Sequence, residues 1–210
     1  MAAAFKFPGI YPITDTLLSG ISHIEQVRKL ILGGAEIIQL RDKSATSFSF
    51  YEAAREVVRV SRESGVRIII NDRVDIAKAV QAHGVHLGQE DLPADMAREL
   101  LGNDAIIGLS THSVQQAVEA MAMPVDYIAV GPIFATSTKA RPDPVIGLDG
   151  LRAVRAAIGT KQLVAIGGID IGNFRDVLSA GADSAAVIGA IIGDPSKIEE
   201  RTRLFNTLSR

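Results

Sequence analysis

A stripe of apolar residues at helical spacing, a turn of small residues and a short apolar run recur in this order along the chain. In one copy, apolar residues within 24–31 lead through Gly33-Gly34-Ala35-Glu36 to the run 37–40. Further copies span 114–130 and 174–188. Residues at i, i+3, i+4 and i+7 are typical of amphipathic helices, and continuous apolar runs are typical of strands buried on both faces. The chain is therefore predicted to alternate helices with parallel strands. The stripe at the start of the second copy consists of Val114, Ala117, Val118 and Met121.

Eight strands are predicted in this way, and a final helix at 201–208 follows them. The strands fall at residues 10–14, 37–40, 68–71, 85–87, 106–110, 127–130, 163–166 and 185–188. Eight strand–helix units in 210 residues leave about 26 residues for each unit, which suits a small (β/α)8 TIM barrel. A doubly wound open sheet has the same alternation. The count of eight and the lack of an early glycine-rich fingerprint favour a single α/β barrel domain over residues 1–210.

Composition excludes several classes of protein. The chain has no cysteine, which excludes a disulfide scaffold, a thiolate metal site and a thiol nucleophile. A net charge of −2 gives no indication of a nucleic-acid partner. No apolar stretch approaches the length of a membrane span, and the first residues lack the apolar run of a signal peptide. We therefore expect a cytoplasmic protein without a membrane partner.

Two carboxylates follow neighbouring predicted strands. In TIM barrels the chemistry takes place at the carboxyl ends of the strands, and Asp72 and Asp91 lie just beyond the third and fourth strands. Adjacent strands are about 4.8 Å apart, so the two side chains can reach one cation. Oxygen ligands without His or Cys suit Mg²⁺. The alternative is that each aspartate caps the helix that follows it.

Cations and glycines at the same face indicate phosphate binding. Arg41 and Lys43 follow the second strand and Lys139 follows the sixth, so three cations lie near the two carboxylates, as in a pyrophosphate site. The alternative is that they are solvated loop charges. Gly167-Gly168 and Gly189 follow the seventh and eighth strands, where TIM barrels often bind a phosphate. The alternative for each glycine is a tight turn that needs a positive φ.

The four histidines are expected to differ in role. His86 lies inside the fourth strand and is expected to be a packed, hydrogen-bonded core residue, whereas His23 and His83 are expected at the surface. His112 faces the mouth of the barrel, where it either contacts a ligand or caps the next helix. Arg141 lies in a proline-rich part of the loop 136–144, which is expected to act as a mobile lid.

Taken together, these residues resemble the thiamine-phosphate synthase family over essentially the whole chain. The stretches His86-Leu87-Gly88-Gln89-Glu90-Asp91 and Thr136-Ser137-Thr138-Lys139 are highly specific in combination. The other matching pieces are Tyr11-Pro12-Ile13-Thr14-Asp15, residues 39–43, Asn71-Asp72, Ser110-Thr111-His112, residues 131–135 and residues 165–169.

The resemblance implies a transferase of thiamine biosynthesis. An aminopyrimidine-methyl diphosphate loses pyrophosphate, and the ring nitrogen of a thiazole phosphate attacks the exposed carbon to give thiamine phosphate. The implied pyrimidine-diphosphate site consists of Gln39, Leu40, Arg41, Asp42, Lys43, Asn71, Ser110 and Lys139. Of these, the implied catalytic residues are Arg41, Lys43, Ser110 and Lys139. The implied thiazole-phosphate site consists of Thr136, Ser137, Thr138, Gly168, Ile188 and Gly189. Asp72 and Asp91 would bind Mg²⁺.

One departure from the family pattern and two rival functions are relevant here. Many family members have Ser where this chain has Gly189, so a hydroxyl donor to the thiazole phosphate is lost.

A thiazole tautomerase of the same fold is the nearest rival, but it would not need the full set of pyrophosphate-binding residues. A non-catalytic phosphate-binding barrel is the other. The expected partners are the two small-molecule substrates, and association as a homodimer is left open.

Overall fold

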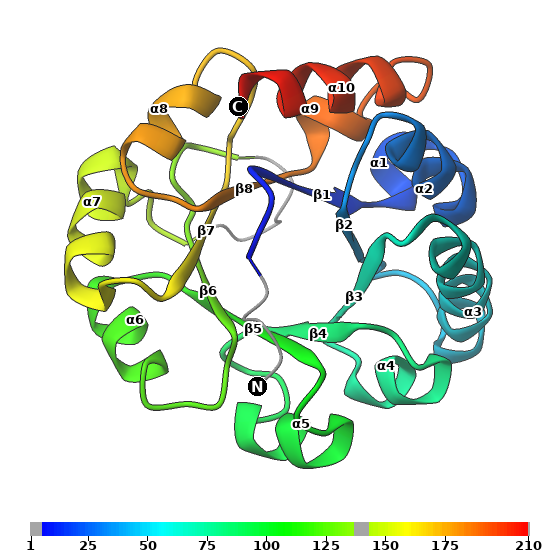
Figure 1. Ribbon diagram of the computed structural model, residues 1–210, viewed down its shortest axis with the longest axis horizontal. Helices are drawn as coiled ribbons and strands as arrows, with labels where there is room; N and C mark the ends of the chain where they lie inside the picture. Colours follow the sequence, from blue (N-terminus) through cyan, green and yellow to red (C-terminus); the bar gives the residue numbers. More distant parts are fainter. Residues whose placement is uncertain (1–5, 137–142, 210) are drawn as a thin grey trace.

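Short runs of Ile, Val, Leu and Ala form eight parallel strands, which close into a barrel in the order β1 to β8. The computed structural model describes residues 6–136 and 143–209. β1 pairs with β8 as well as with β2, so the sheet has no open edge, which confirms the TIM barrel and excludes the open sheet (Figure 1). The strands are β1 (Ile10–Thr14), β2 (Ile37–Leu40), β3 (Arg67–Asn71), β4 (Gly84–Leu87), β5 (Ile106–Thr111), β6 (Tyr127–Val130), β7 (Gln162–Ile166) and β8 (Ser184–Val187).

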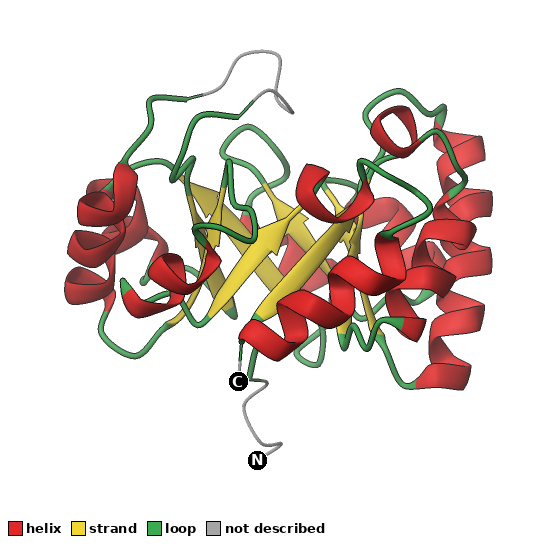
Figure 2. Ribbon diagram, turned by 90° about the horizontal axis from the view of Figure 1, so that it is seen from above, coloured by secondary structure: helices red, strands yellow, loops and turns green. Residues whose placement is uncertain are grey.

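Helices form a ring outside the barrel, with the strands at the centre (Figures 1 and 2). They are α1 (Thr16–Ser19), α2 (His23–Leu32), α3 (Ser47–Ser64), α4 (Val74–Val80), α5 (Ala94–Leu101), α6 (Val114–Ala120), α7 (Gly147–Ile158), α8 (Phe174–Ser179), α9 (Gly189–Ile192) and α10 (Ile198–Leu208). The short helices α1 and α9 are additions in the loops after β1 and β8. A capping box of Ser22 and Glu25 fixes the start of α2.

The alternation of side chains along each strand produces two cores. Outward-facing residues of the strands pack against the helices and form the larger core. Inward-facing residues fill the barrel itself, as expected for a barrel of this size. The inner core consists of Phe7, Tyr11, Ile13, Ile37, Ile69, Ile106, Tyr127, Ala129, Val164 and Ala186. Its three aromatic rings pack together, with Phe7 4.5 Å from Tyr127 and 5.4 Å from Tyr11 between ring centroids.

Most of the apolar stripe predicted for α6 faces solvent instead of the barrel. Ala117 and Ala120 are buried against the barrel, whereas Val114, Val118 and the neighbouring Met121 are 37%, 48% and 44% exposed. Small side chains thus form the contact face, and the larger apolar residues at i, i+4 and i+7 lie on the solvent side.

The two histidines expected at the surface are both held by hydrogen bonds. His23 is only 4% exposed, because its ring lies between two polar side chains. Its Nδ1 is 2.8 Å from Thr14 Oγ1, and its Nε2 is 3.3 Å from the Asp42 carboxylate. Burial lowers the pKa of His23, against the opposing effect of Asp42. The half-buried ring of His83 accepts a hydrogen bond from the Ile68 amide at 3.0 Å. The prediction of a surface position was therefore wrong for His23, whereas His83 is partly exposed.

Within residues 6–136 and 143–209, no helix combines the length and the apolar character that crossing a membrane requires.

Candidate active site

Asp15 fixes the position of Arg41 at the mouth of the barrel. Arg41 follows β2, and its guanidinium donates to the Asp15 carboxylate across a distance of 2.5 Å. The other carboxylate oxygen of Asp15 accepts from the Leu18 amide and caps α1. Both side chains of the ion pair are largely shielded from solvent. Asp15 was not among the predicted site residues, although it lies in one of the family-like stretches.

The Asp42 carboxylate is used inside its own loop. It accepts hydrogen bonds from the Ser44 amide at 2.9 Å, the Ala45 amide at 2.9 Å and the Thr16 hydroxyl at 3.0 Å. Burial alone would raise the pKa of Asp42, but the bonds from Ser44, Thr16 and Ala45 hold it at about 2. These contacts order the loop that carries Arg41, and contact between Asp42 and a substrate stays a prediction. Leu40 is fully buried in the outer core, so only its backbone is available at the mouth.

Asp72 and Asp91 lie together beyond β3 and β4. Lys43 donates to the Asp72 carboxylate, and Asp91 accepts from the Gly88 amide at 2.7 Å. Burial raises the pKa of Asp91, and the adjacent Asp72 carboxyl raises it further. Asp72 has a φ of 61°, a left-handed conformation in which few residues other than Gly are found.

Neither aspartate caps a helix, so that alternative is excluded. The residue before α4 is Arg73 and the residue before α5 is Pro93, and neither helix has a side-chain cap. The pair fits a divalent cation in its donor chemistry, because two carboxylates lie in contact and the Asp72 carboxylate already binds one cationic group, the Lys43 ammonium. Among residues 6–136 and 143–209, no group of three or more acidic, histidine or cysteine side chains is arranged so that it could hold a metal ion. A cation such as Mg²⁺ would thus take its remaining ligands from water and substrate phosphates.

Three polar side chains face the inside of the mouth above the inner core. Gln39 lies near the end of β2, Asn71 ends β3, and Ser110 lies near the end of β5. Gln39 is only 2% exposed, and its amide donates to the Tyr11 hydroxyl at 3.1 Å. The structure therefore brings these predicted residues to the same end of the barrel as Arg41, Lys43 and the aspartate pair.

His86 is a packed core histidine, as predicted. It is 7% exposed and stacks on Tyr127 with ring centroids 5.4 Å apart. Its Nδ1 lies 2.9 Å from the Tyr127 hydroxyl, and its Nε2 lies 2.8 Å from the Ser110 hydroxyl. Burial lowers the pKa of His86 to about 4, so the ring is neutral near pH 7. The roles of Tyr11 and Tyr127 were not predicted, because contacts across the barrel leave no local pattern in the sequence.

Two glycines after β7 lie close to the loop after β6. Gly167 and Gly168 have φ values of 104° and 63°. A Cβ at Gly168 would lie 2.5 Å from the Ala135 carbonyl oxygen, and a Cβ at Gly167 would lie 2.5 Å from Pro132. The tight-turn interpretation is thus supported for both. The close approach also brings Gly168 next to the segment that carries Thr136.

The rest of the predicted thiazole-phosphate site is only partly described. Ile188 is half-buried and precedes α9, and Gly189 is exposed at the first position of this short helix. A Cβ at Gly189 would make only an ordinary contact, 3.7 Å from Leu18. Ser137, Thr138, Lys139 and Arg141 lie outside the described residues, as does most of the predicted lid.

His112 connects β5 to the loop after β6. Its Nδ1 lies 2.7 Å from the Gly131 carbonyl oxygen and 3.5 Å from the Asp143 carboxylate. Ser113 caps α6, so the alternative in which His112 caps this helix is wrong.

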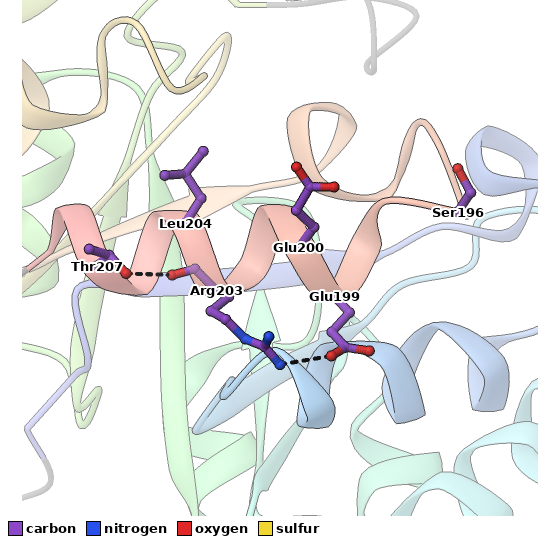
Figure 3. Close-up of a pocket in the computed structure, with 6 residues that line it drawn as sticks. All are labelled: Ser196, Glu199, Glu200, Arg203, Leu204 and Thr207. Atoms are coloured by element: carbon purple, nitrogen blue, oxygen red, sulfur yellow. Dashed lines mark hydrogen bonds and ion pairs between the residues drawn. The ribbon is translucent and has the colours of Figure 1, made fainter.

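A hollow on the outer surface of α10 is separate from the strand ends. Figure 3 shows its lining, in which Arg203 pairs with Glu199 at 2.7 Å and Thr207 donates to the Arg203 carbonyl oxygen. All of its lining residues come from α10 and the preceding turn. It contains none of the predicted site residues.

Comparison with known proteins gives one consistent result. A family model described as thiamine monophosphate synthase matches residues 10–191. The chain is 48% identical to the thiamine-phosphate synthase of Syntrophomonas wolfei over 92% of both chains. It is 46% identical to that of Chloroflexus aurantiacus over 87% of this chain and 84% of the relative. Its fold matches a thiamine phosphate pyrophosphorylase from Pyrococcus furiosus with a TM-score of 0.86 and 37% identity, over 96% of this chain and 95% of the other.

Proposed function

The chain belongs to the thiamine monophosphate synthase family, and on this basis we propose which parts of the barrel mouth hold its two substrates. The reaction joins 4-amino-2-methyl-5-pyrimidinylmethyl diphosphate to 4-methyl-5-(2-phosphoethyl)thiazole and gives thiamine phosphate and pyrophosphate. The chain is thus a transferase that acts on small molecules.

The chemistry requires the enzyme to stabilise a leaving group. The bond between the pyrimidine methylene carbon and the diphosphate oxygen breaks, and its electron pair leaves with pyrophosphate. The lone pair of the thiazole nitrogen then forms the new bond to that carbon, which makes the thiazole ring cationic. No proton needs to be removed from the nucleophile. Charged donors around the diphosphate therefore contribute more than a general base would.

Arg41 and Lys43 are proposed to bind the diphosphate. Arg41 offers a planar fork of donors and Lys43 a point charge, and both follow β2. Asp15 orients the Arg41 guanidinium, which reduces the freedom that the side chain would lose on binding. Lys139 is proposed to contact the same diphosphate from the loop after β6.

Asp72 and Asp91 are proposed to hold Mg²⁺ beside the diphosphate. The support is the donor set: two carboxylates lie in contact next to a lysine ammonium, and burial together with the Asp72 carboxyl raises the pKa of Asp91. When bound, Mg²⁺ would offset the negative charge of the departing pyrophosphate. Lys43 would then lie between Asp72 and the diphosphate, within reach of either.

The inner polar residues are proposed to bind the pyrimidine ring. The opposite side of the mouth is proposed to bind the thiazole phosphate. Gln39, Asn71 and Ser110 offer amide and hydroxyl groups that suit the aminopyrimidine. Thr136, Ser137, Thr138 and the backbone at Gly168 and Gly189 are proposed to bind the thiazole phosphate. The support is the close approach of Gly168 to Ala135, which brings the loops after β6 and β7 together.

The single observation that carries this proposal is the aspartate pair with Lys43 beside Arg41, because a barrel acting on the thiazole phosphate alone would not need them. The test is a coupled pyrophosphate-release assay with both substrates and Mg²⁺, with thiamine phosphate measured by chromatography. We expect one pyrophosphate for each thiamine phosphate. Conversion of the thiazole phosphate without pyrophosphate release would instead identify a tautomerase. Ligand binding without turnover would identify a phosphate-binding barrel.

We also propose that the protein is cytoplasmic and associates as a homodimer. The absence of cysteine is compatible with a reducing compartment. Large apolar side chains are exposed on the neighbouring helices α5 and α6, among them Met96, Leu100 and Val118, and such surfaces often form interfaces. Analytical ultracentrifugation tests the dimer.

A further inference from the structure

A continuous chain of hydrogen bonds crosses the inside of the barrel from Gln39 to Ser110. Gln39 Nε2 lies 3.1 Å from the Tyr11 hydroxyl, which lies 3.1 Å from the Tyr127 hydroxyl. The Tyr127 hydroxyl lies 2.9 Å from His86 Nδ1, and His86 Nε2 lies 2.8 Å from the Ser110 hydroxyl. The chain thus joins two proposed pyrimidine-binding residues on β2 and β5 through three buried rings.

The direction of this chain follows from counting its protons. The Gln39 amide nitrogen can only donate, so the Tyr11 oxygen accepts this hydrogen bond. Within the described residues its other partner is the Tyr127 hydroxyl, so the Tyr11 proton points to Tyr127. Within the described residues, the other partner of the Tyr127 hydroxyl is His86 Nδ1, so Tyr127 donates to that nitrogen. A neutral imidazole with an accepting Nδ1 carries its proton on Nε2. His86 therefore donates to Ser110 and leaves the Ser110 proton free to point into the mouth.

Gly108 makes the contact between Tyr127 and His86 possible. In the sheet register, Gly108 pairs with His86 on one side and with Tyr127 on the other. A Cβ at position 108 would lie 2.0 Å from Tyr127 Cζ and 2.5 Å from its hydroxyl oxygen. The tyrosine ring thus occupies the space that a side chain at 108 would fill, and so crosses β5 to stack on His86.

We propose that this chain fixes Ser110 as a hydrogen-bond donor toward the pyrimidine diphosphate, with His86 and Tyr127 as positioning residues that act through Ser110. Gln39 Oε1 has no hydrogen-bond partner among the described residues, which leaves it available as an acceptor at the other end. The two ends thus present one acceptor and one donor, a pattern complementary to an aminopyrimidine, whose amino group donates and whose ring nitrogen accepts. The identity of the ligand rests on the proposed function, whereas the direction of the chain is a property of the free protein.

The first test is the tautomer of His86 in the free protein. With ¹⁵N-labelled histidine at neutral pH, we expect His86 Nε2 to resonate as a protonated ring nitrogen and Nδ1 as an unprotonated one. Loss of these signals in His86→Gln assigns them among the four histidines. In Tyr127→Phe the donor to Nδ1 is gone, so we expect the two nitrogens to shift toward a mixture of tautomers. A protonated Nδ1 in the parent protein would overturn the proposal.

The second test is kinetic and asks whether Tyr127 acts through Ser110. We expect Tyr127→Phe to lower kcat for pyrophosphate release about tenfold, the effect of about one hydrogen bond, with little change in the KM for the thiazole phosphate. Ser110→Ala should lower kcat by a similar factor. Adding Tyr127→Phe to Ser110→Ala should then change kcat by less than about twofold. Tyr51→Phe is the matched control, because Tyr51 lies on α3 beside Arg55, outside the barrel.

The outcomes separate three explanations. If Tyr127 only packs the core, Tyr127→Phe lowers thermal stability, and the loss of kcat in the double variant equals the product of the losses in the two single variants. This result would overturn the proposal. If the parent protein releases no pyrophosphate, the proposed function fails, while the NMR result still decides the direction of the chain. An unprotonated Nδ1 together with a non-multiplicative double variant supports the proposal.

Discussion

His86 should make the free energy of unfolding depend on pH between about 6.5 and 4, because burial lowers the pKa of its ring. Burial lowers the pKa of His86 to about 4, whereas an unfolded histidine titrates near 6.5. Above about pH 6.5 both states are neutral and the protein has its full stability. As the pH falls from there toward 4, protons bind the unfolded state first, and stability is lost. The free energy of unfolding should fall by about 1.4 kcal/mol at pH 5.5 and about 2.5 kcal/mol at pH 4.5 from this ring alone.

Urea unfolding followed by circular dichroism at about pH 7.5, 5.5 and 4.5 measures this contribution. The variant is His86→Gln, in which the amide does not titrate. His23 and His83, whose pKa values burial also lowers, are present in both proteins and cancel in the comparison. We expect the variant to lose about 1.4 kcal/mol less than the parent between pH 7.5 and 5.5. Ser110→Ala is the control, because it removes a hydrogen bond to His86 but keeps the ring, and should retain the pH dependence of the parent. Equal pH dependence in the parent and His86→Gln would refute the reasoning.

Four further predictions concern the mouth of the barrel. Asp72→Asn and Asp91→Asn should each raise the Mg²⁺ concentration for half-maximal rate about tenfold while the circular dichroism spectrum is unchanged; activity that resists EDTA in both would contradict the metal site. Lys139→Ala should lower kcat far more than it raises the thiazole-phosphate KM, and a change confined to that KM would place Lys139 on the other substrate. Gly168→Ala should cost about 2 kcal/mol in urea unfolding because its Cβ meets the loop after β6, whereas Gly189→Ser should cost less than about 0.5 kcal/mol. Calorimetric titration should show that Gly189→Asp loses affinity for the thiazole phosphate alone, and unchanged affinity would move that phosphate elsewhere.

The strands could be predicted because burial on both faces leaves continuous apolar runs in the sequence. The starts and ends of the predicted strands differ from the structure by at most one residue, mostly where polar residues such as Arg67, Thr111 and Gln162 extend a strand. Two other strands differ: β4 begins one residue earlier, at Gly84, and β8 begins at the buried Ser184, while Ile188 leaves the sheet just before α9. Apolar content alone gives no indication of these differences.

The positions of the candidate site residues were predictable where they follow from the end of a strand. Asp72 and Asp91 had to lie near each other once the third and fourth strands were adjacent, and the structure brings them into contact. Asp15 was missed because its role depends on the direction in which Arg41 turns after β2. The position of His23 was predicted wrongly because its partners Thr14 and Asp42 come from other segments of the chain.

Tyr11 and Tyr127 connect the packing of the barrel to the geometry of its mouth. Their rings pack against each other at 6.0 Å and against Phe7 in the inner core, while their hydroxyls carry the hydrogen bonds that reach Gln39 and His86. Burial raises the pKa of both hydroxyls, so they stay neutral and act as donor and acceptor together. A Phe at either position would preserve most of the apolar packing but interrupt the polar chain. Stability and the orientation of Ser110 should therefore respond differently to the same substitution, because the ring supports the core and the hydroxyl supports the site.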